Sequence, residues 1–158
     1  MVDDVDRQHL RRCIELARTA LEAGDEPFGS VLVSAEGRVL FEDHNHVASG
    51  DATQHPEFAI ARWAAQHLTA GQRAAATVYT SGEHCPMCSA AHAWVGLGRI
   101  VYVSSAAQTS RWVAEFGAPT APVRPLPIPE VAPGLVVDGP VAGLDDEVRE
   151  LHRRFHRA

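Results

Sequence analysis

The sequence predicts a layered α/β domain, because helix-type and strand-type segments alternate along most of its length after an initial pair of strands. Its 158 residues fit one domain with one substantial core. The 46% hydrophobic and 22% charged fractions exclude a disordered chain. Since strands joined through helices usually pair in parallel, we expect a mixed sheet with parallel later strands and helices on both faces.

The first third of the chain predicts one helix and one hairpin. Apolar residues recur at helical spacing over 6–23, and Gly24 follows where a helix C-terminal cap belongs. Two β-type runs come next, 28–33 and 39–44. A short turn-rich segment of hairpin length separates them, which indicates an antiparallel pair.

The middle of the chain alternates helices with short strands. An alanine-rich stretch predicts a helix over 56–68, and a short apolar run predicts a strand over 76–80. A second helix is expected over 86–97, followed by a strand over 99–103 and a further helix within 104–117. This order favours the parallel pairing of the later strands.

Prolines dominate the segment that follows. Residues 118–133 hold six of the ten prolines, which predicts an extended connector without regular structure. The connector leads to a C-terminal helical tail over 141–156. We find neither a repeat nor a second core, so residues 1–158 are expected to form a single domain.

The charge balance argues against a polyanionic partner. The formal net charge is −6, and all 14 basic residues are arginine. No lysine-rich surface is therefore available to bind a nucleic-acid backbone, and nucleic acid is not the expected partner. Four arginines lie in the C-terminal tail, but neighbouring acidic residues indicate a solvated helix face.

The sequence also predicts a cytoplasmic protein without a membrane partner. No apolar run approaches the roughly 20 residues of a membrane span, and the acidic first residues lack the features of a signal peptide. Three cysteines, two of them spaced C-x-x-C, fit a reducing compartment and metal or thiol chemistry.

Two short motifs carry the chemistry. The segment 55–57 reads His-Pro-Glu and the segment 85–88 reads Cys-Pro-Met-Cys, each at the start of a predicted helix. Proline suits the first position of a helix, where its missing N–H is not needed. The exposed N–H groups of a helix start carry partial positive charge, which stabilises thiolates and other anions.

These motifs supply the ligands of a catalytic zinc site. The imidazole of His55 and the thiolates of Cys85 and Cys88 give three ligands and leave the fourth tetrahedral position for water. Zinc can lower the pKa of that water to about 7, so hydroxide is available near neutral pH. Glu57 lies two residues from His55, close enough to the water to carry protons. The predicted cofactor is Zn²⁺, and Glu57 is the predicted catalytic residue.

H-x-E followed about thirty residues later by C-x-x-C resembles the H-x-E and P-C-x-x-C signature of the cytidine deaminase-like superfamily. The resemblance spans most of residues 25–103 and is most similar to the bacterial guanine and cytosine deaminases and the related tRNA adenosine deaminases. It implies a three-layer α-β-α fold with a mixed five-stranded sheet, usually in a homodimer. The matching segments are Glu26-Pro27-Phe28-Gly29, Asn45, His55-Pro56-Glu57, Tyr79-Thr80-Ser81 and Cys85-Pro86-Met87-Cys88.

The resemblance also implies substrate contacts. Asn45 is expected to hydrogen-bond the substrate, Phe28 to pack against its ring, and the Ser81 backbone to hold the departing amine. Trp112 follows the strand after the second motif, in a region that closes over the ring in relatives, and is a candidate pocket wall. His84 replaces the family's usual proline and is a further candidate contact.

The predicted reaction is hydrolytic deamination of a free nucleobase or nucleoside with release of ammonia. Glu57 would protonate the ring nitrogen next to the amino-bearing carbon and then the leaving amine. Guanine-type, cytosine-type and nonstandard amino-bases share this unit, so the motifs do not choose among them. Gly82 stands where some guanine deaminases carry another cysteine, which also leaves the base open. A tRNA adenosine deaminase is the alternative within the family, and the acidic balance fits it less well.

Two alternatives belong to other classes. A C-x-x-C at a helix start also occurs in thiol-disulfide oxidoreductases. That hypothesis leaves the His-Pro-Glu segment unexplained and lacks the early strand of a thioredoxin-like unit. A structural zinc site would need a fourth protein ligand, for which His84 or His92 could be nominated.

Overall fold

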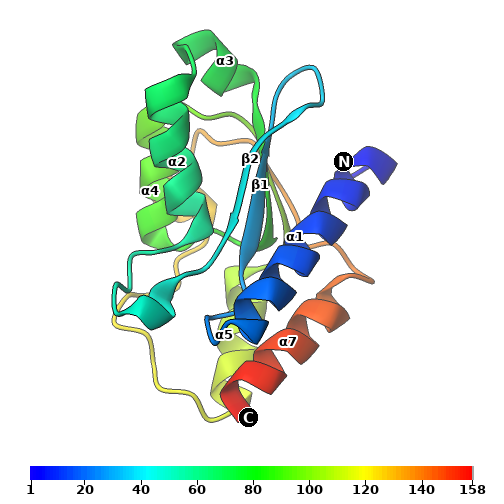
Figure 1. Ribbon diagram of the computed structural model, residues 1–158, viewed down its shortest axis with the longest axis vertical. Helices are drawn as coiled ribbons and strands as arrows, with labels where there is room; N and C mark the ends of the chain where they lie inside the picture. Colours follow the sequence, from blue (N-terminus) through cyan, green and yellow to red (C-terminus); the bar gives the residue numbers. More distant parts are fainter. Residues whose placement is uncertain (158) are drawn as a thin grey trace.

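The computed structural model describes residues 1–157 and shows one five-stranded sheet between two layers of helices (Figure 1). This is the three-layer, mixed-sheet architecture expected above. The sheet order is β2-β1-β3-β4-β5. The strand β1 pairs antiparallel with β2 and β3, whereas β3, β4 and β5 run parallel. The strands are β1 Gly29–Val33, β2 Val39–His44, β3 Thr77–Gly82, β4 Ile100–Ser104 and β5 Val137–Asp138.

The helices divide between the two faces of the sheet. One face is covered by α1, α5 and α7, and the other mainly by α2 and α4 (Figure 1). The longer helices are α1 Asp4–Glu22, α2 Pro56–His67, α4 Pro86–Val95, α5 Ala106–Glu115 and α7 Asp145–Arg157. Three short ones complete the set: η1 Val47–Ser49, α3 Ala70–Ala75 and α6 Ile128–Val131.

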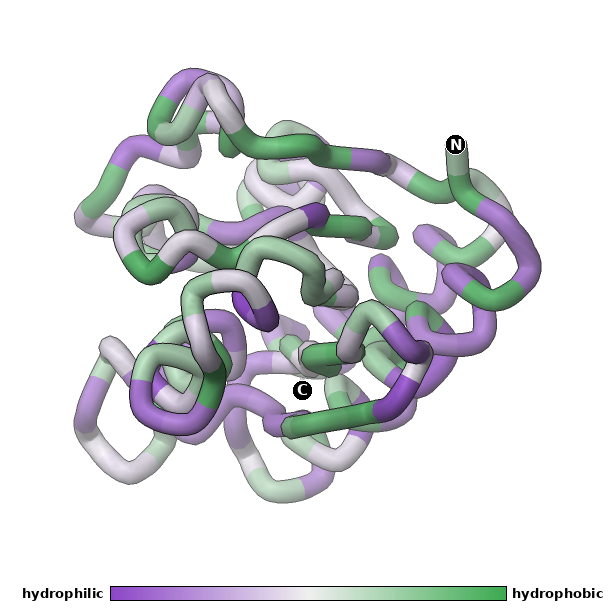
Figure 2. Tube along the Cα trace, turned by 90° about the horizontal axis from the view of Figure 1, so that it is seen from above, coloured by the Kyte–Doolittle hydropathy of each residue, from purple (hydrophilic) through white to green (hydrophobic). Residues whose placement is uncertain are grey.

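The strand sequences explain why the sheet is buried on both faces. In β1, Val31 and Val33 pack with the α1 face while Leu32 packs with the α2 face. Tyr79 and Val78 of β3 divide in the same way. Successive side chains of a strand point to opposite faces, and helices cover both faces. Strands buried in this way therefore appear as continuous apolar runs in the sequence. Around the sheet, hydrophobic and hydrophilic residues alternate along the outer helices (Figure 2).

The start of β1 passes directly beneath α1. A side chain on Gly29 would collide with the backbone of Cys13 and the side chain of Leu16, so only glycine fits there. Cys13 itself is fully buried in the hydrophobic core. The close approach of α1 to Gly29 fixes the position of the end of β1 at which the candidate site lies.

The C-terminal half departs from the sequence expectation in two places. The connector is not wholly irregular, because α6 forms at 128–131 with prolines at positions that a helix start tolerates. Glu83 holds this segment: one carboxylate oxygen accepts the N–H of Ile128 at 2.7 Å and the other accepts that of Ala106 at 2.8 Å. The terminal helix begins at Asp145 rather than at residue 141, since Gly143 adopts a positive φ of 92° just before it.

None of the helices in residues 1–157 has the length and apolarity that crossing a membrane requires.

Candidate metal and catalytic site

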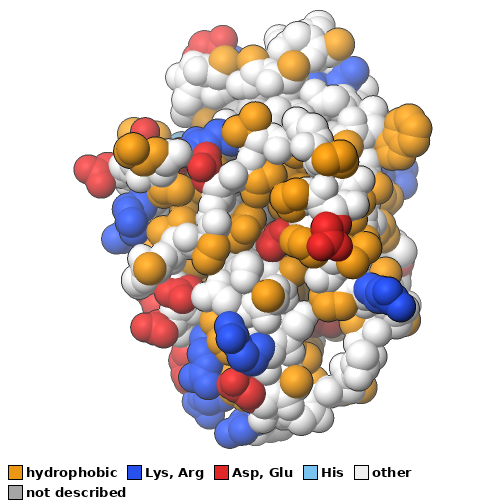
Figure 3. All heavy atoms as spheres, turned by 180° about the vertical axis from the view of Figure 1, so that it is seen from behind, with side chains coloured by type: hydrophobic (Ala, Val, Ile, Leu, Met, Phe, Trp, Pro, Cys, Tyr) orange, Lys and Arg blue, Asp and Glu red, His pale blue; other side chains and the backbone are white. Residues whose placement is uncertain are grey.

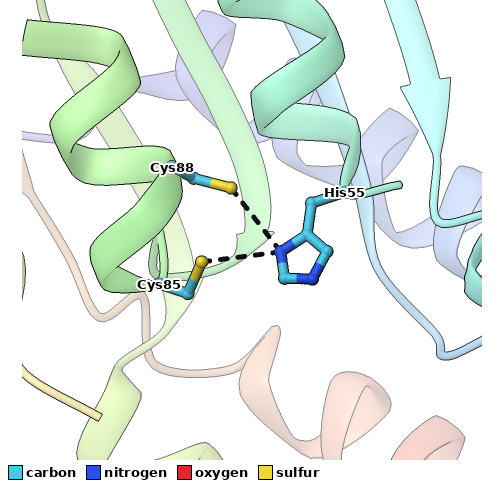
Figure 4. A group of neighbouring side chains, drawn as sticks. All are labelled: His55, Cys85 and Cys88. Carbon is cyan, nitrogen blue, oxygen red and sulfur yellow. Dashed lines mark hydrogen bonds between the residues drawn. The ribbon is translucent and has the colours of Figure 1, made fainter. Parts of the chain in front are cut away.

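The two sequence motifs meet at the N-terminal ends of α2 and α4. His55 is the residue that precedes α2, and Cys85 is the residue that precedes α4. The Nδ1 atom of His55 lies 3.5 Å from the sulfur of Cys85 and 3.5 Å from the sulfur of Cys88 (Figure 4). Proline follows both cap residues, which fixes the direction in which each helix starts.

These separations fit a tetrahedral zinc ion. Zinc binds imidazole nitrogen at about 2.0–2.1 Å and thiolate sulfur at about 2.3 Å, which places the two ligand atoms about 3.5 Å apart at a tetrahedral angle. Both cysteines are free thiols. One imidazole, two sulfurs and no further protein ligand within the described residues match the donor set of a catalytic zinc centre.

The side chains at this point favour the thiolate form of one cysteine. Hydrogen bonds from the Cys88 thiol and from His55 lower the pKa of Cys85 to about 4. The hydrogen bond with Cys85 raises the pKa of His55 to about 9. Without a metal, Cys85 and His55 therefore form a thiolate–imidazolium pair at neutral pH, and metal binding displaces the proton from His55.

Glu57 lies in the first turn of α2 with only 6% of its surface exposed. Its Oε1 atom is 2.9 Å from the hydroxyl of Ser30 and 2.8 Å from the hydroxyl of Thr80. The second oxygen, Oε2, accepts no side-chain hydrogen bond from any residue within 1–157. Burial raises the pKa of Glu57, as expected for a carboxyl group that both accepts and donates protons.

The first residues of β1 connect this carboxylate to the predicted substrate contacts. The carbonyl of Phe28 accepts the backbone N–H of Asn45 at 3.0 Å. The N–H of Gly29 donates to the hydroxyl of Ser81 at 3.1 Å. Ser30 then contacts Glu57. The structure therefore brings Phe28, Asn45, Ser81 and Glu57 around one end of β1.

The polar atoms of Asn45 and Ser81 are partly occupied. The side-chain carbonyl of Asn45 accepts the N–H of Val47 at 2.9 Å, which leaves its NH₂ group as the available donor. The backbone carbonyl of Ser81 accepts the hydroxyl of Ser104 at 3.0 Å and keeps one lone pair for another donor. Asn45 can thus donate and Ser81 can accept.

Phe28 has two neighbours that the sequence analysis did not predict to contact it. Its ring meets the ring of His152 edge-on, with centroids 4.9 Å apart. A side-chain carbon on Gly82 would come within 3.0 Å of the Phe28 ring, so Gly82 leaves room for it. His152 is 1% exposed, and neither ring nitrogen has a hydrogen-bond partner in the described chain. Burial lowers its pKa to about 3.

The structure places the other two candidate contacts in buried surroundings. His84 is 1% exposed and packs edge-on against His92, with centroids 5.4 Å apart. Neither histidine joins His55 and the cysteines as a ligand within residues 1–157. Trp112 is 6% exposed and belongs to the core on the α1 face. Its ring reaches that of His152 at 6.4 Å, so it lies behind His152.

A groove of about 400 Å³ runs beside α2. It is lined by His55, Phe41, Trp63 and Arg62, among others. Neither cysteine nor Glu57 lines it. Among the candidate site residues, His55 is the one that lines this groove.

Ser30, Thr80 and His152 are the site residues that sequence reasoning missed. Ser30 left a weak signal, because it is a small hydroxyl residue next to an apolar run, and Thr80 stands in a segment that resembles the family but was given no role. His152 left none, since its place beside Phe28 depends on how α7 packs across the sheet.

The fold is a sheet between two layers of helices, and its candidate site places one imidazole and two thiols beside a buried carboxylate. This combination is typical of the class of zinc-dependent deaminases. The model of the cytidine and deoxycytidylate deaminase zinc-binding region matches residues 3–104, and the chain belongs to that family.

Curated relatives act on different bases. The chain is 34% identical over 103 residues to a probable cytosine deaminase of Schizosaccharomyces pombe, covering 64% of this chain and 61% of the relative. It is 37% identical over 97 residues to a guanine deaminase of Bacillus subtilis, covering 60% and 62%. A tRNA-specific adenosine deaminase of Agrobacterium fabrum is 36% identical over 87 residues, covering 54% and 57%. The chain thus spans about three fifths of the length of these relatives.

Among solved structures, the guanine deaminase from Nitrosomonas europaea shares the fold. It superimposes with a TM-score of 0.71 at 20% identity, covering 100% of this chain and 87% of the other. The likeness extends through the connector and α7, beyond the residues that the family model matches.

Proposed function

We propose that the chain is a zinc-dependent hydrolytic deaminase of a free nucleobase or nucleoside. His55, Cys85 and Cys88 hold the zinc ion, and Glu57 carries the protons. The observation behind this proposal is the pair of 3.5 Å separations from Nδ1 of His55 to both sulfurs, next to a buried carboxylate. Two reduced cysteines at the centre of the site also favour a cytoplasmic location.

When bound, zinc supplies Lewis acidity that lowers the pKa of a coordinated water to about 7. Glu57 accepts a proton at Oε2 while Ser30 and Thr80 hold Oε1. It delivers that proton to the ring nitrogen beside the amino-bearing carbon. The water oxygen bonds to that carbon as its first proton passes to Glu57. The same carboxylate then carries the proton of the new hydroxyl group to the amine, the C–N bond breaks, ammonia leaves, and the carbon keeps the oxygen as an oxo group.

Residues around the start of β1, together with the helix α7, provide the substrate contacts. Phe28 offers an aromatic surface, and the NH₂ group of Asn45 donates to a carbonyl oxygen or a ring nitrogen of the base. The free lone pair of the Ser81 carbonyl accepts from the exocyclic amine. His152, neutral at pH 7 and edge-on to Phe28, bounds the same region from α7.

A small substrate is favoured over tRNA by the charge of the chain. The formal net charge is −6, and no lysine is present. Two of the four arginines of α7 form ion pairs, Arg149 with Glu115 at 3.0 Å and Arg153 with Glu150 at 2.6 Å. Figure 3 shows basic and acidic side chains side by side at the end of the molecule where α7 lies. Such a mixed surface offers few free cations to a phosphate backbone.

The test is an ammonia-release screen of the zinc-loaded protein. Cytosine, guanine, adenine, isoguanine, their nucleosides and triazines are offered, together with a tRNA anticodon hairpin. We expect turnover of at least one free base or nucleoside. Turnover of the hairpin alone would instead identify a tRNA deaminase.

The matched variants are Glu57→Gln and Glu36→Gln. Glu57→Gln should keep one zinc per site and lose activity by at least a hundredfold, because amide cannot carry the proton. Glu36 is an exposed residue of the β1–β2 turn, and its substitution should leave turnover unchanged. Wild-type turnover in Glu57→Gln would remove Glu57 from the reaction.

A further inference from the structure

We propose that Asp25, His44 and His46 form a second metal site, separate from the one at His55. Asp25 lies between α1 and β1, His44 ends β2, and His46 immediately precedes η1. One ligand atom from each of the three side chains lies within 4.8 Å of the other two. None of the three is shared with the first metal site.

Both histidines are already oriented in the manner of metal ligands. Nδ1 of His44 donates to the backbone carbonyl of Asn45 at 2.8 Å, which leaves Nε2 without a partner. Nε2 of His46 donates to the carboxylate of Asp43 at 2.8 Å, which leaves Nδ1. A metal-bound histidine almost always donates its other N–H to a carbonyl or carboxylate in this way. The ring centroids of the two histidines are only 4.2 Å apart.

Asp25 carries a negative charge that no described basic side chain neutralises. It is 6% exposed, and one of its oxygens accepts the N–H of Ala48 at 2.8 Å. No arginine within residues 1–157 forms an ion pair with it. A buried carboxylate is costly unless it is paired or bound to a cation. A divalent ion between Asp25 and the two imidazoles would supply the missing charge.

Two imidazoles and one carboxylate select the kind of ion. Imidazole nitrogen suits Zn²⁺, Co²⁺ and Ni²⁺, whereas Mg²⁺ and Ca²⁺ favour sites made of oxygen. Tetrahedral coordination at about 2.0–2.1 Å places nitrogen and oxygen ligands about 3.3 Å apart, closer than the outer limit of 4.8 Å here.

The position of the site suggests what the ion does. Its ligands lie on either side of Asn45 in the sequence and also include the loop before β1. A bound ion would join these segments and restrain the backbone that carries Asn45.

The test is a Co²⁺ titration of metal-free protein that carries no histidine tag. Cobalt bound by thiolates absorbs strongly through sulfur-to-metal charge transfer, whereas cobalt bound by nitrogen and oxygen absorbs weakly. We expect two equivalents to bind, one with the charge-transfer band and one without it. The first reports the cysteines and the second reports Asp25, His44 and His46.

Two histidine variants make the assignment specific. His46→Gln should retain the charge-transfer equivalent and weaken the other by at least a hundredfold. His67→Gln removes an exposed histidine of α2 that lies outside the site and should retain both equivalents. Asp43→Asn, which alters the carboxylate that contacts both His46 and the backbone N–H of His44, should weaken the second equivalent about tenfold to a hundredfold. Binding of one equivalent to the wild type, or a second equivalent unaffected by His46→Gln, would overturn the proposal.

Discussion

Glu57 is positioned by two hydroxyl groups from neighbouring strands. Ser30 of β1 and Thr80 of β3 pair across the sheet, and both reach the same carboxylate oxygen. The hydroxyls of Ser30 and Thr80 are also 2.9 Å apart. A buried carboxylate held at one oxygen keeps the other oriented for proton transfer, which requires hydrogen-bond distances to the reacting atoms.

Thr80→Val removes one of these hydroxyls while keeping the shape of the side chain. Hydrogen bonds to charged groups contribute about 1.5–3 kcal/mol, so we expect kcat to fall roughly tenfold to a hundredfold with little change in KM. Steady-state kinetics on the best base from the screen measures this. Thr77→Val, on the same strand but away from Glu57, serves as the control. Equal kcat in Thr80→Val and the wild type would show that the hydroxyl does not position Glu57.

The candidate metal ligands could be named from the sequence because both motifs are local. A proline at the first position of a helix and a C-x-x-C pair can both be recognised in the sequence itself. The burial of His84 and Trp112 was not predictable, since it depends on the packing of α4, α5 and α7. The grouping of Asp25 with His44 and His46 likewise depends on the turn between α1 and β1 meeting the end of β2.

At the scale of elements, α1 is fastened to the sheet by a buried ion pair. Asp6 in the first turn of α1 lies 2.9 Å from Arg99 and accepts the hydroxyl of Tyr79 at 2.7 Å. Arg99 also pairs with Asp138 of β5 at 2.8 Å. Burial alone would raise the pKa of Asp6, but the hydrogen bonds from Arg99 and Tyr79 outweigh it and lower the pKa to about 2.

This pair predicts a pH-dependent stability. A carboxyl group whose pKa is lowered by folding stabilises the protein above its unfolded pKa of about 3.9. The contribution is lost as the pH falls from about 4 to about 2. Asp6→Asn should therefore reduce the free energy of unfolding by about 2 kcal/mol at pH 6, with the difference disappearing near pH 2.

Urea unfolding of the wild type and Asp6→Asn across this pH range measures the effect. Asp4→Asn is the control, because Asp4 lies in the same helical turn and is exposed. It should change stability by less than about 0.5 kcal/mol. A difference for Asp6→Asn that stays constant down to pH 2 would exclude charge as its source.

The longer helices and four of the strands were predictable, because their apolar periods are clear and glycine or proline bounds several of them. The two-residue β5 and the four-residue α6 were not, since neither is long enough to show a period. Both depend on tertiary partners instead. Glu83 caps α6 from the candidate site, and Arg99 ties β5 to its neighbouring strand.

At the scale of the molecule, one large aromatic side chain lies on the surface instead of in the core. Trp94, near the end of α4, is 89% exposed, whereas Trp63 of α2 stacks on Phe41. Large exposed aromatic side chains are enriched at protein interfaces. We propose that the α4 surface contacts a second copy of the chain, in line with the homodimer that the family resemblance implies.

Light scattering tests this proposal. The wild type should have twice the chain mass of 17.1 kDa, and Trp94→Glu should return it to the mass of one chain. Val123→Glu, at an exposed position of the connector, should leave the mass unchanged. A wild-type mass of 17.1 kDa at micromolar concentration would contradict the dimer.

The central claim is that His55, Cys85 and Cys88 bind one zinc ion together. X-ray absorption at the zinc edge, on protein loaded with a single equivalent, tests it most directly. We predict two sulfur neighbours at about 2.3 Å and nitrogen or oxygen neighbours at about 2.0–2.1 Å. A spectrum without sulfur neighbours, or a disulfide between Cys85 and Cys88 in the active protein, would contradict the account.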